Sequence, residues 1–147
     1  MAVKNREFVK VAVCLVFVAS ATIGCGSATS NSGGMSRVKG LSMLFTKVSS
    51  DLGREPANEQ EFKQGITNSG VPLERLSVAS VDELFISDRD GQPLVVVYGR
   101  RPQGSDVIIY EQTGVDGKRQ VAHRIGTIEE VDGSRFTELV PTVSPAK

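Results

Sequence analysis

The chain opens with a basic segment and an apolar run in the order of an export signal. Residues 1–10 carry three basic side chains against one acidic one, and residues 11–23 are apolar except for Ser20 and Thr22. Small residues gather toward the end of this run, as in a cleaved secretory signal. Its thirteen residues would form a helix of about 20 Å, shorter than the roughly 30 Å hydrocarbon core of a bilayer. The pattern therefore predicts a signal peptide over residues 1–24 and disfavours a permanent membrane span.

Residues Thr22-Ile23-Gly24-Cys25, at the end of the run, resemble the lipobox of bacterial lipoproteins. That motif has two aliphatic or small residues, then Gly, Ala or Ser, then the cysteine, and Thr22 stands where Leu is usual. The resemblance implies that the leader is cleaved before Cys25, that a diacylglycerol is attached to its sulfur, and that a fatty acid such as palmitate acylates the new amino group. Two or three acyl chains hold a protein on a membrane far longer than one chain does. The implied location is the cell membrane or the outer membrane, with the domain outside the cytoplasm. Ordinary secretion after cleavage and an uncleaved signal anchor are the alternatives.

The rest of the chain divides into a linker, one domain and a tail. Residues 26–34 are small or polar, and nine residues of this composition predict a flexible linker with a root-mean-square reach of about 15 to 18 Å. Removing the first 24 of the 147 residues leaves 123, which is enough for one hydrophobic core. We therefore expect the lipidated cysteine and linker over residues 25–34, a single domain over residues 35–140 and a loose tail over residues 141–147.

Charge and cysteine content narrow the classes of partner. After residue 24 the chain has 14 basic and 16 acidic residues, so its net charge gives no overall attraction to nucleic acid or anionic lipid. Cys14 lies in the leader and Cys25 is the expected lipid site, which leaves the domain without a disulfide. The fold therefore depends on packing alone.

The domain begins with helical periodicity. Apolar residues recur at three- and four-residue steps from Val38 to Leu52, and Gly53 can end the helix as a C-cap. Gly40 costs about 1 kcal/mol relative to Ala inside a helix, so we predict the helix from Leu41 onward.

A second, shorter helix is predicted after Pro56. Asn58 followed by Glu61 has the spacing of a capping box, and the helix should end by residues 68–70. One further helical turn is predicted at residues 73–76.

The pattern then changes to short β-branched and aromatic runs separated by turn signals. Asp90-Gly91, Asp116-Gly117 and Gly126 can supply the positive φ that tight reversals need. The run Val95-Val96-Val97 predicts a central strand that is covered on both faces. Asp132-Gly133-Ser134 fits another hairpin turn or the N-cap of a terminal helix, and the helix is favoured. The predicted strands are 84–86, 94–98, 107–110, 119–125 and 127–131.

These elements predict an α+β fold. One or two N-terminal helices pack on an antiparallel β-meander of four to five strands, and a short C-terminal helix follows. The order of strands and loops over residues 84–140 resembles the sheet of type II secretion pseudopilins. Because the apolar run stops at Cys25, the resemblance implies an accessory of a secretion or surface assembly rather than a filament subunit.

The candidate reactive residues are few. Strand alternation puts His123 on the apolar face beside Val121 and Ile125, which favours a half-buried, hydrogen-bonded histidine of the core. A serine hydrolase would need a strained turn such as Gly-x-Ser-x-Gly, which the sequence lacks. Asp88 and Asp90 could offer oxygens to calcium, but the residues that follow do not continue an EF-hand loop. Turn chemistry is therefore the favoured interpretation of this pair, and no metal or other cofactor is predicted.

Two further pairs of charged residues are adjacent in the sequence. Glu129 and Glu130 are adjacent in a predicted strand, so they should point to opposite faces, which does not suit a paired acid and base. Arg100 and Arg101 lie in the connection over residues 99–105. A solvated hairpin tip is favoured for this loop over a partner-binding one.

The sequence thus predicts a lipid-anchored protein of the cell envelope with a binding or structural role and no reaction of its own. Its predicted partners are the membrane, through lipid on Cys25, and an envelope protein, but not nucleic acid. A pseudopilin-like accessory and a small hydrolase with an unrecognised site are the alternatives.

Overall fold

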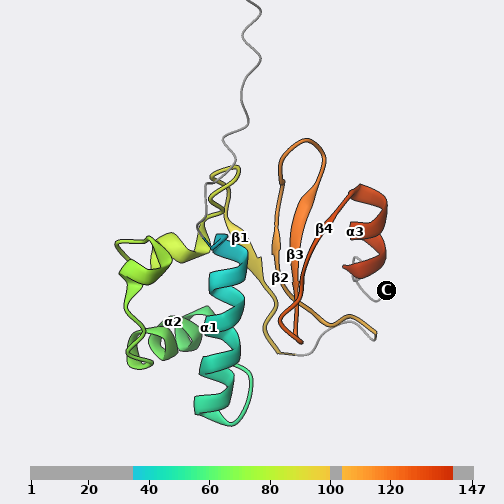
Figure 1. Cartoon of the computed structure of the whole chain (residues 1–147). Coiled ribbons are helices and arrows are strands. Elements are labelled where there is room, and N and C mark those ends of the chain that lie inside the picture. The colour runs from blue at the N-terminus through green and yellow to red at the C-terminus, as the bar shows by residue number, and fades with distance from the viewer. Residues whose placement is uncertain (1–34, 100–103, 141–147) are drawn as a thin grey trace, which may run out of the picture. The chain divides into compact units, whose positions relative to one another are not determined.

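The computed structural model describes residues 35–99 and 104–140. These residues form an α+β fold in which N-terminal helices pack on a four-stranded antiparallel sheet and a short helix ends the domain (Figure 1). The predicted fold class is confirmed. Cys25, the expected signal peptide and linker, the Arg100-Arg101 tip and the expected tail lie outside the described residues. No helix within the described residues is long and apolar enough to cross a membrane.

Helix α1 spans Arg37–Leu52, and the predicted start at Leu41 is wrong by one turn. The side chain of Ser36 caps the helix by accepting a hydrogen bond from the Lys39 amide. Gly40 is buried, and a Cβ built there would lie 3.3 Å from a methyl carbon of Leu76. Close packing of Leu76 therefore offsets the helix-propensity cost of this glycine.

Helix α2 spans Glu59–Asn68, and its predicted N-cap is confirmed. The Asn58 side chain accepts a hydrogen bond from the Glu61 amide at 2.9 Å. The Glu61 carboxylate in turn accepts from the amide of Ala57 at 2.6 Å, one residue earlier than a standard capping box. The predicted helical turn is also present, as the 3₁₀ turn η1 at Leu73–Leu76.

The predicted strand at residues 84–86 is wrong, because this segment forms the 3₁₀ turn η2 at Asp82–Phe85. Leu84 and Phe85 both enter the main core, whereas adjacent residues of a strand would point to opposite faces. Ile86 makes only an isolated bridge to Pro93. Because Pro93 has no amide hydrogen, it cannot extend a ladder.

The sheet has the order β1-β2-β3-β4, with every neighbouring pair antiparallel. Without a strand at 84–86, β1 lies at the edge of the sheet. The prediction that residues 95–97 form a central strand is therefore wrong, and all three are only partly buried. The central strands are β2 and β3. The strands span Leu94–Val96 (β1), Val107–Glu111 (β2), Arg119–His123 (β3) and Ile128–Val131 (β4).

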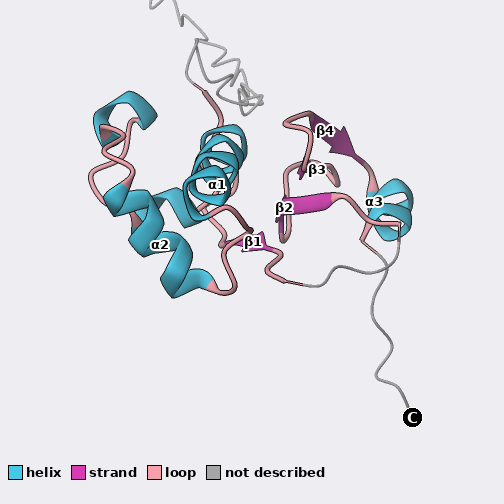
Figure 2. Ribbon diagram, turned by 90° about the horizontal axis from the view of Figure 1, so that it is seen from below, coloured by secondary structure: helices cyan, strands magenta, loops and turns pink. Residues whose placement is uncertain are grey.

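Helices lie on both faces of the sheet (Figure 2). Helix α1 packs on β2 and β3, as predicted, and with α2 and the two 3₁₀ turns it builds the larger core. The predicted terminal helix is confirmed as α3, Gly133–Leu139, with Asp132 as its N-cap. Its Phe136 packs edge-on against Tyr110, with ring centroids 5.2 Å apart. The smaller core beneath α3 is built on Val107, Val121 and Val131.

Candidate functional site

Two adjoining cavities lie between α1 and the turn that joins β3 to β4, with volumes of about 270 and 410 Å³. Both are lined by Thr46 and Arg124. We call this surface the α1–turn groove. Its first part is lined by Phe45, Ser49, Ser50, Gly53, Arg54, Glu55 and Ile108, and its second part by Ser42, Met43, Lys47, Ile125 and Gly126.

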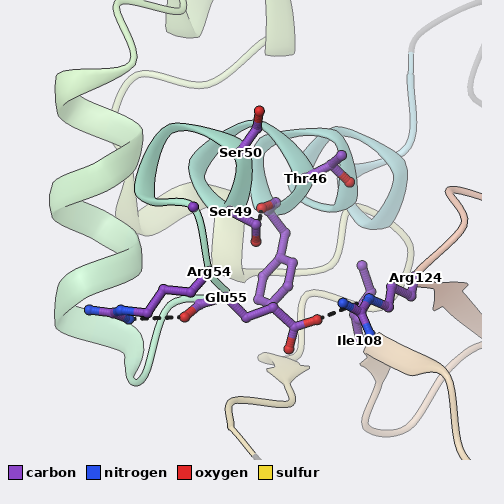
Figure 3. A pocket seen from close by; sticks show the side chains of 9 residues that line it. Thr46, Ser49, Ser50, Arg54, Glu55, Ile108 and Arg124 are labelled. Atoms are coloured by element: carbon purple, nitrogen blue, oxygen red, sulfur yellow. Dashed lines mark hydrogen bonds and ion pairs between the residues drawn. The ribbon is translucent and has the colours of Figure 1, made fainter.

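The first part of the groove mixes polar and apolar groups, and its charged side chains are paired within the protein. Figure 3 shows Glu55 and Arg124 directed toward each other, with the Arg124 Nε 3.2 Å from a Glu55 carboxylate oxygen. Arg54 donates to the Glu55 carbonyl oxygen and also pairs with Glu61. The Ser49 hydroxyl donates to the carbonyl oxygen of Phe45 at 2.7 Å. No carboxylate or histidine of the described residues is hydrogen-bonded to this hydroxyl, so none is placed to activate it.

The second part of the groove is apolar and exposed. Ile125 is 81% exposed and Met43 is 54% exposed. The β3–β4 turn closes through two hydrogen bonds, from the His123 amide to Thr127 and from the Gly126 amide to His123. Gly126 has φ +87°, which favours glycine. This turn holds Ile125 away from the core.

The prediction for His123 is confirmed in part. Its side chain is buried, with the residue 8% exposed, and Nδ1 lies 2.8 Å from Asp106. Nε2 faces Glu129 at 3.3 Å. The placement of Ile125 on the same apolar face is wrong, because β3 ends at His123 and the chain reverses. His123 lines neither part of the groove, and no serine among the described residues is hydrogen-bonded to it.

Both aspartates lie in a turn, as predicted, and both also make contacts between elements. Asp90 accepts hydrogen bonds from the amides of Gln92 and Gly114, and these bonds lower its pKa against the opposing effect of burial, which is the largest single influence on this pKa. Asp88 accepts from the amide of Arg37 at the start of α1. Within residues 35–99 and 104–140, no three His, Cys, Asp or Glu side chains are grouped to hold a metal ion.

The adjacent glutamates Glu129 and Glu130 have separate partners, as expected for opposite faces. Glu129 faces His123 and Arg135, whereas Glu130 pairs with Arg89 at 3.1 Å. They therefore do not form a paired acid and base.

Sequence reasoning missed two features. The groove joins residues from α1 and a distant turn, and no local pattern marks it. The second is Glu111, a fully buried carboxylate that accepts hydrogen bonds from Ser87, Arg89 and the Gln120 amide. Its position directly after the apolar run 107–110 gives no sign of burial.

Comparison of the chain with protein-family models, with curated proteins and with solved structures found no match.

Proposed function

We propose that this protein is a lipid-anchored component of the bacterial cell envelope with a binding or structural role and no reaction of its own. The proposal rests on one observation above all, the lipobox-like sequence Thr22–Cys25 directly after a basic and apolar leader. A cysteine that follows such a leader provides a thioether for two acyl chains, and a third chain on the amino group makes release from a bilayer slow.

The groups in the domain favour binding over catalysis. A general base must lie within hydrogen-bond reach of the proton that it removes. His123 instead faces two carboxylates away from the groove, and Glu55 faces an arginine. The α1–turn groove includes Met43 and Arg124, two residue types that are enriched at protein contact surfaces, beside the exposed Ile125.

The decisive experiment is to express the full chain with its own leader in a bacterium and to measure the intact mass of the protein in each cell fraction. We expect the protein in the membrane fraction, cleaved before Cys25 and carrying the mass of diacylglycerol and an amide-linked acyl chain. Cys25→Ala should abolish both the added mass and the membrane location. Cys14→Ala is the matched control and should change neither, because Cys14 lies in the leader. An unmodified Cys25 thiol, in protein free in the medium or cytosol, would overturn the proposal.

The second candidate is an accessory of a secretion or surface assembly. It is favoured by the order of β2, β3, β4 and α3 along the chain, which is the order that the pseudopilin resemblance implies. Cross-linking in intact cells followed by capture of the lipidated protein tests it. Specific recovery of components of a secretion assembly would support this candidate, and recovery of the protein free of such components would exclude it.

A further inference from the structure

The apolar part of the α1–turn groove combines exposure with a fixed position. Large apolar side chains that are exposed occur at five described positions, namely Met35, Met43, Leu52, Ile86 and Ile125. Met43 and Ile125 are the two that line one cavity. Met43 projects from a helix and Ile125 from a hydrogen-bonded turn, so the backbone holds both residues at the surface.

Basic side chains surround this apolar pair. Lys47 and Arg124 line the same cavity, and both are substantially exposed despite their ion pairs with Asp51 and Glu55. Lys39 lies one turn before Met43 on the exposed side of α1 and has no carboxylate partner within residues 35–99 and 104–140. Long basic side chains can lay their stems on apolar surface and present their charges to headgroup phosphates. Because the ion pairs of Lys47 and Arg124 are neutral, Lys39 is the cation of this surface that no described carboxylate offsets, whereas the whole domain is slightly acidic.

The position of Cys25 sets how far this surface can stand from a bilayer. Ten residues separate the start of the mature chain from Met35, and fully extended they span at most about 35 Å. Met43 lies six residues into α1, about 9 Å along the helix axis. The patch is thus within reach of the membrane that would hold the lipid.

From these observations we infer that Met43 and Ile125 insert into the interfacial region of the anchoring bilayer, with Lys39, Lys47 and Arg124 against anionic headgroups. This inference rests on the proposed lipid anchor and adds an orientation to it. The proposed ligand is the lipid surface itself. Its apolar interface would contact Met43 and Ile125, and its phosphates would face the basic side chains. Contact at this surface would fix α1 against the membrane and leave α3 and β1 free for other partners.

The experiment uses the mature, lipidated chain in vesicles of phosphatidylcholine and phosphatidylglycerol. This chain contains no free thiol once Cys14 is removed with the leader and Cys25 is acylated, so one introduced cysteine can be labelled alone. Met43→Cys and Ile125→Cys place a fluorophore on the patch. Gln64→Cys, on the exposed side of α2, is the matched control. Accessibility is measured with aqueous iodide and with lipids that carry a quencher near the headgroup.

We expect labels at residues 43 and 125 to lose accessibility to iodide and to be quenched by the lipid probe, while the label at residue 64 stays accessible to iodide. Lys39→Gln with Lys47→Gln should reduce this protection on anionic vesicles and leave it unchanged on vesicles of phosphatidylcholine alone.

Equal accessibility at all three positions, in protein that still floats with the vesicles, would overturn the orientation but leave the lipid anchor intact. Protein that fails to float would instead count against the anchor, and the inference would fall with it. Protection that grows with protein density on the vesicle would identify a second copy as the occupant and would also overturn the inference.

Discussion

At the scale of single residues, the most unusual group in the domain is the buried carboxylate of Glu111. Three donors surround it: the Ser87 hydroxyl at 2.9 Å, the Arg89 guanidinium at 3.0 Å and the backbone amide of Gln120 at 2.7 Å. Together they tie the loop before β1 to strands β2 and β3. A buried carboxylate is tolerated only when it is paired and hydrogen-bonded in this way.

Removing this carboxylate should destabilise the fold strongly. Glu111→Ala leaves a largely buried guanidinium and an amide without their acceptor, and we expect a loss of about 3 kcal/mol in the free energy of unfolding. Glu130→Ala is the matched control, because Glu130 pairs with the same arginine but its side chain is 45% exposed; its loss should stay below about 1 kcal/mol. Urea denaturation measures both. If Glu111→Ala lost no more than about 1 kcal/mol, like Glu130→Ala, the buried network would contribute little to stability.

The lowered pKa of Glu61 predicts that the folded protein loses stability in acid. The hydrogen bond from Arg54, with that from the Ala57 amide, lowers this pKa from 4.5 to about 2. The ionised form is therefore favoured in the folded state, and its contribution is present above pH 4.5 and is lost as the pH falls from 4.5 toward 2. The gap in urea midpoint between the wild type and Glu61→Gln should accordingly narrow across that interval. A gap that stays constant across this interval would mean that Arg54 and the Ala57 amide do not favour the ionised form of Glu61.

At the scale of elements, the helices were predictable because their signals are local. Asn58 with Glu61 and Asp132 before Gly133 act within four residues of the helix that each begins. The segment 84–86 was not predictable in this way. Its β-branched and aromatic composition fits a strand, but burial of Leu84 and Phe85 in one core requires a helical turn. That requirement comes from helices α1 and α2, which a local pattern does not contain.

The contact between α1 and α2 depends on the absence of a side chain at residue 65. A Cβ built on Gly65 would clash with one methyl carbon of Val48 and lie 3.0 Å from the other. Val48 is buried in α1, and a β-branched side chain in a helix has little rotamer freedom to move aside.

Gly65→Ala should therefore destabilise the protein, although alanine is the better helix former. The gain in helix propensity is about 1 kcal/mol and overpacking costs about 1 to 3 kcal/mol, so we expect a net loss of roughly 1 kcal/mol. In a double-mutant cycle with Val48→Ala, the cost of alanine at residue 65 should disappear because the clash is removed. A more stable Gly65→Ala protein would mean that the two helices separate readily to admit the methyl group.

At the scale of the whole molecule, the candidate site is the part that sequence reasoning could not reach. Met43 and Ile125 lie 82 positions apart, and they meet because α1 packs across β2 and β3. Ile125 was expected in the core, since strand alternation continues past His123 in the sequence. Gly126 predicted the reversal, but the strand ends at His123, two residues before the predicted end, and no residue in the sequence marks that earlier end.

The sheet is covered unequally, and this inequality predicts how the molecule unfolds. The face under α1 has a large core that includes Phe45 and Phe62, whereas α3 covers the other face with seven residues. Phe136 carries much of the smaller contact, against the ring of Tyr110 and beneath the Arg119 guanidinium, 4.2 Å from the ring centroid. Elements with few buried contacts open before the rest of a domain.

In native-state hydrogen exchange, the amides of α3 should therefore exchange at lower free energy than those of α1, β2 and β3. Phe136→Ala should abolish the remaining protection of α3 while the amide chemical shifts of α1 and α2 stay as in the wild type, because the larger core is untouched. Phe45→Ala is the contrasting variant: that side chain is buried in the core shared by α1, α2 and the sheet, so protection should fall together in α1, α2, β2 and β3. Uniform loss of protection in Phe136→Ala would mean instead that the two faces of the sheet unfold as a single unit.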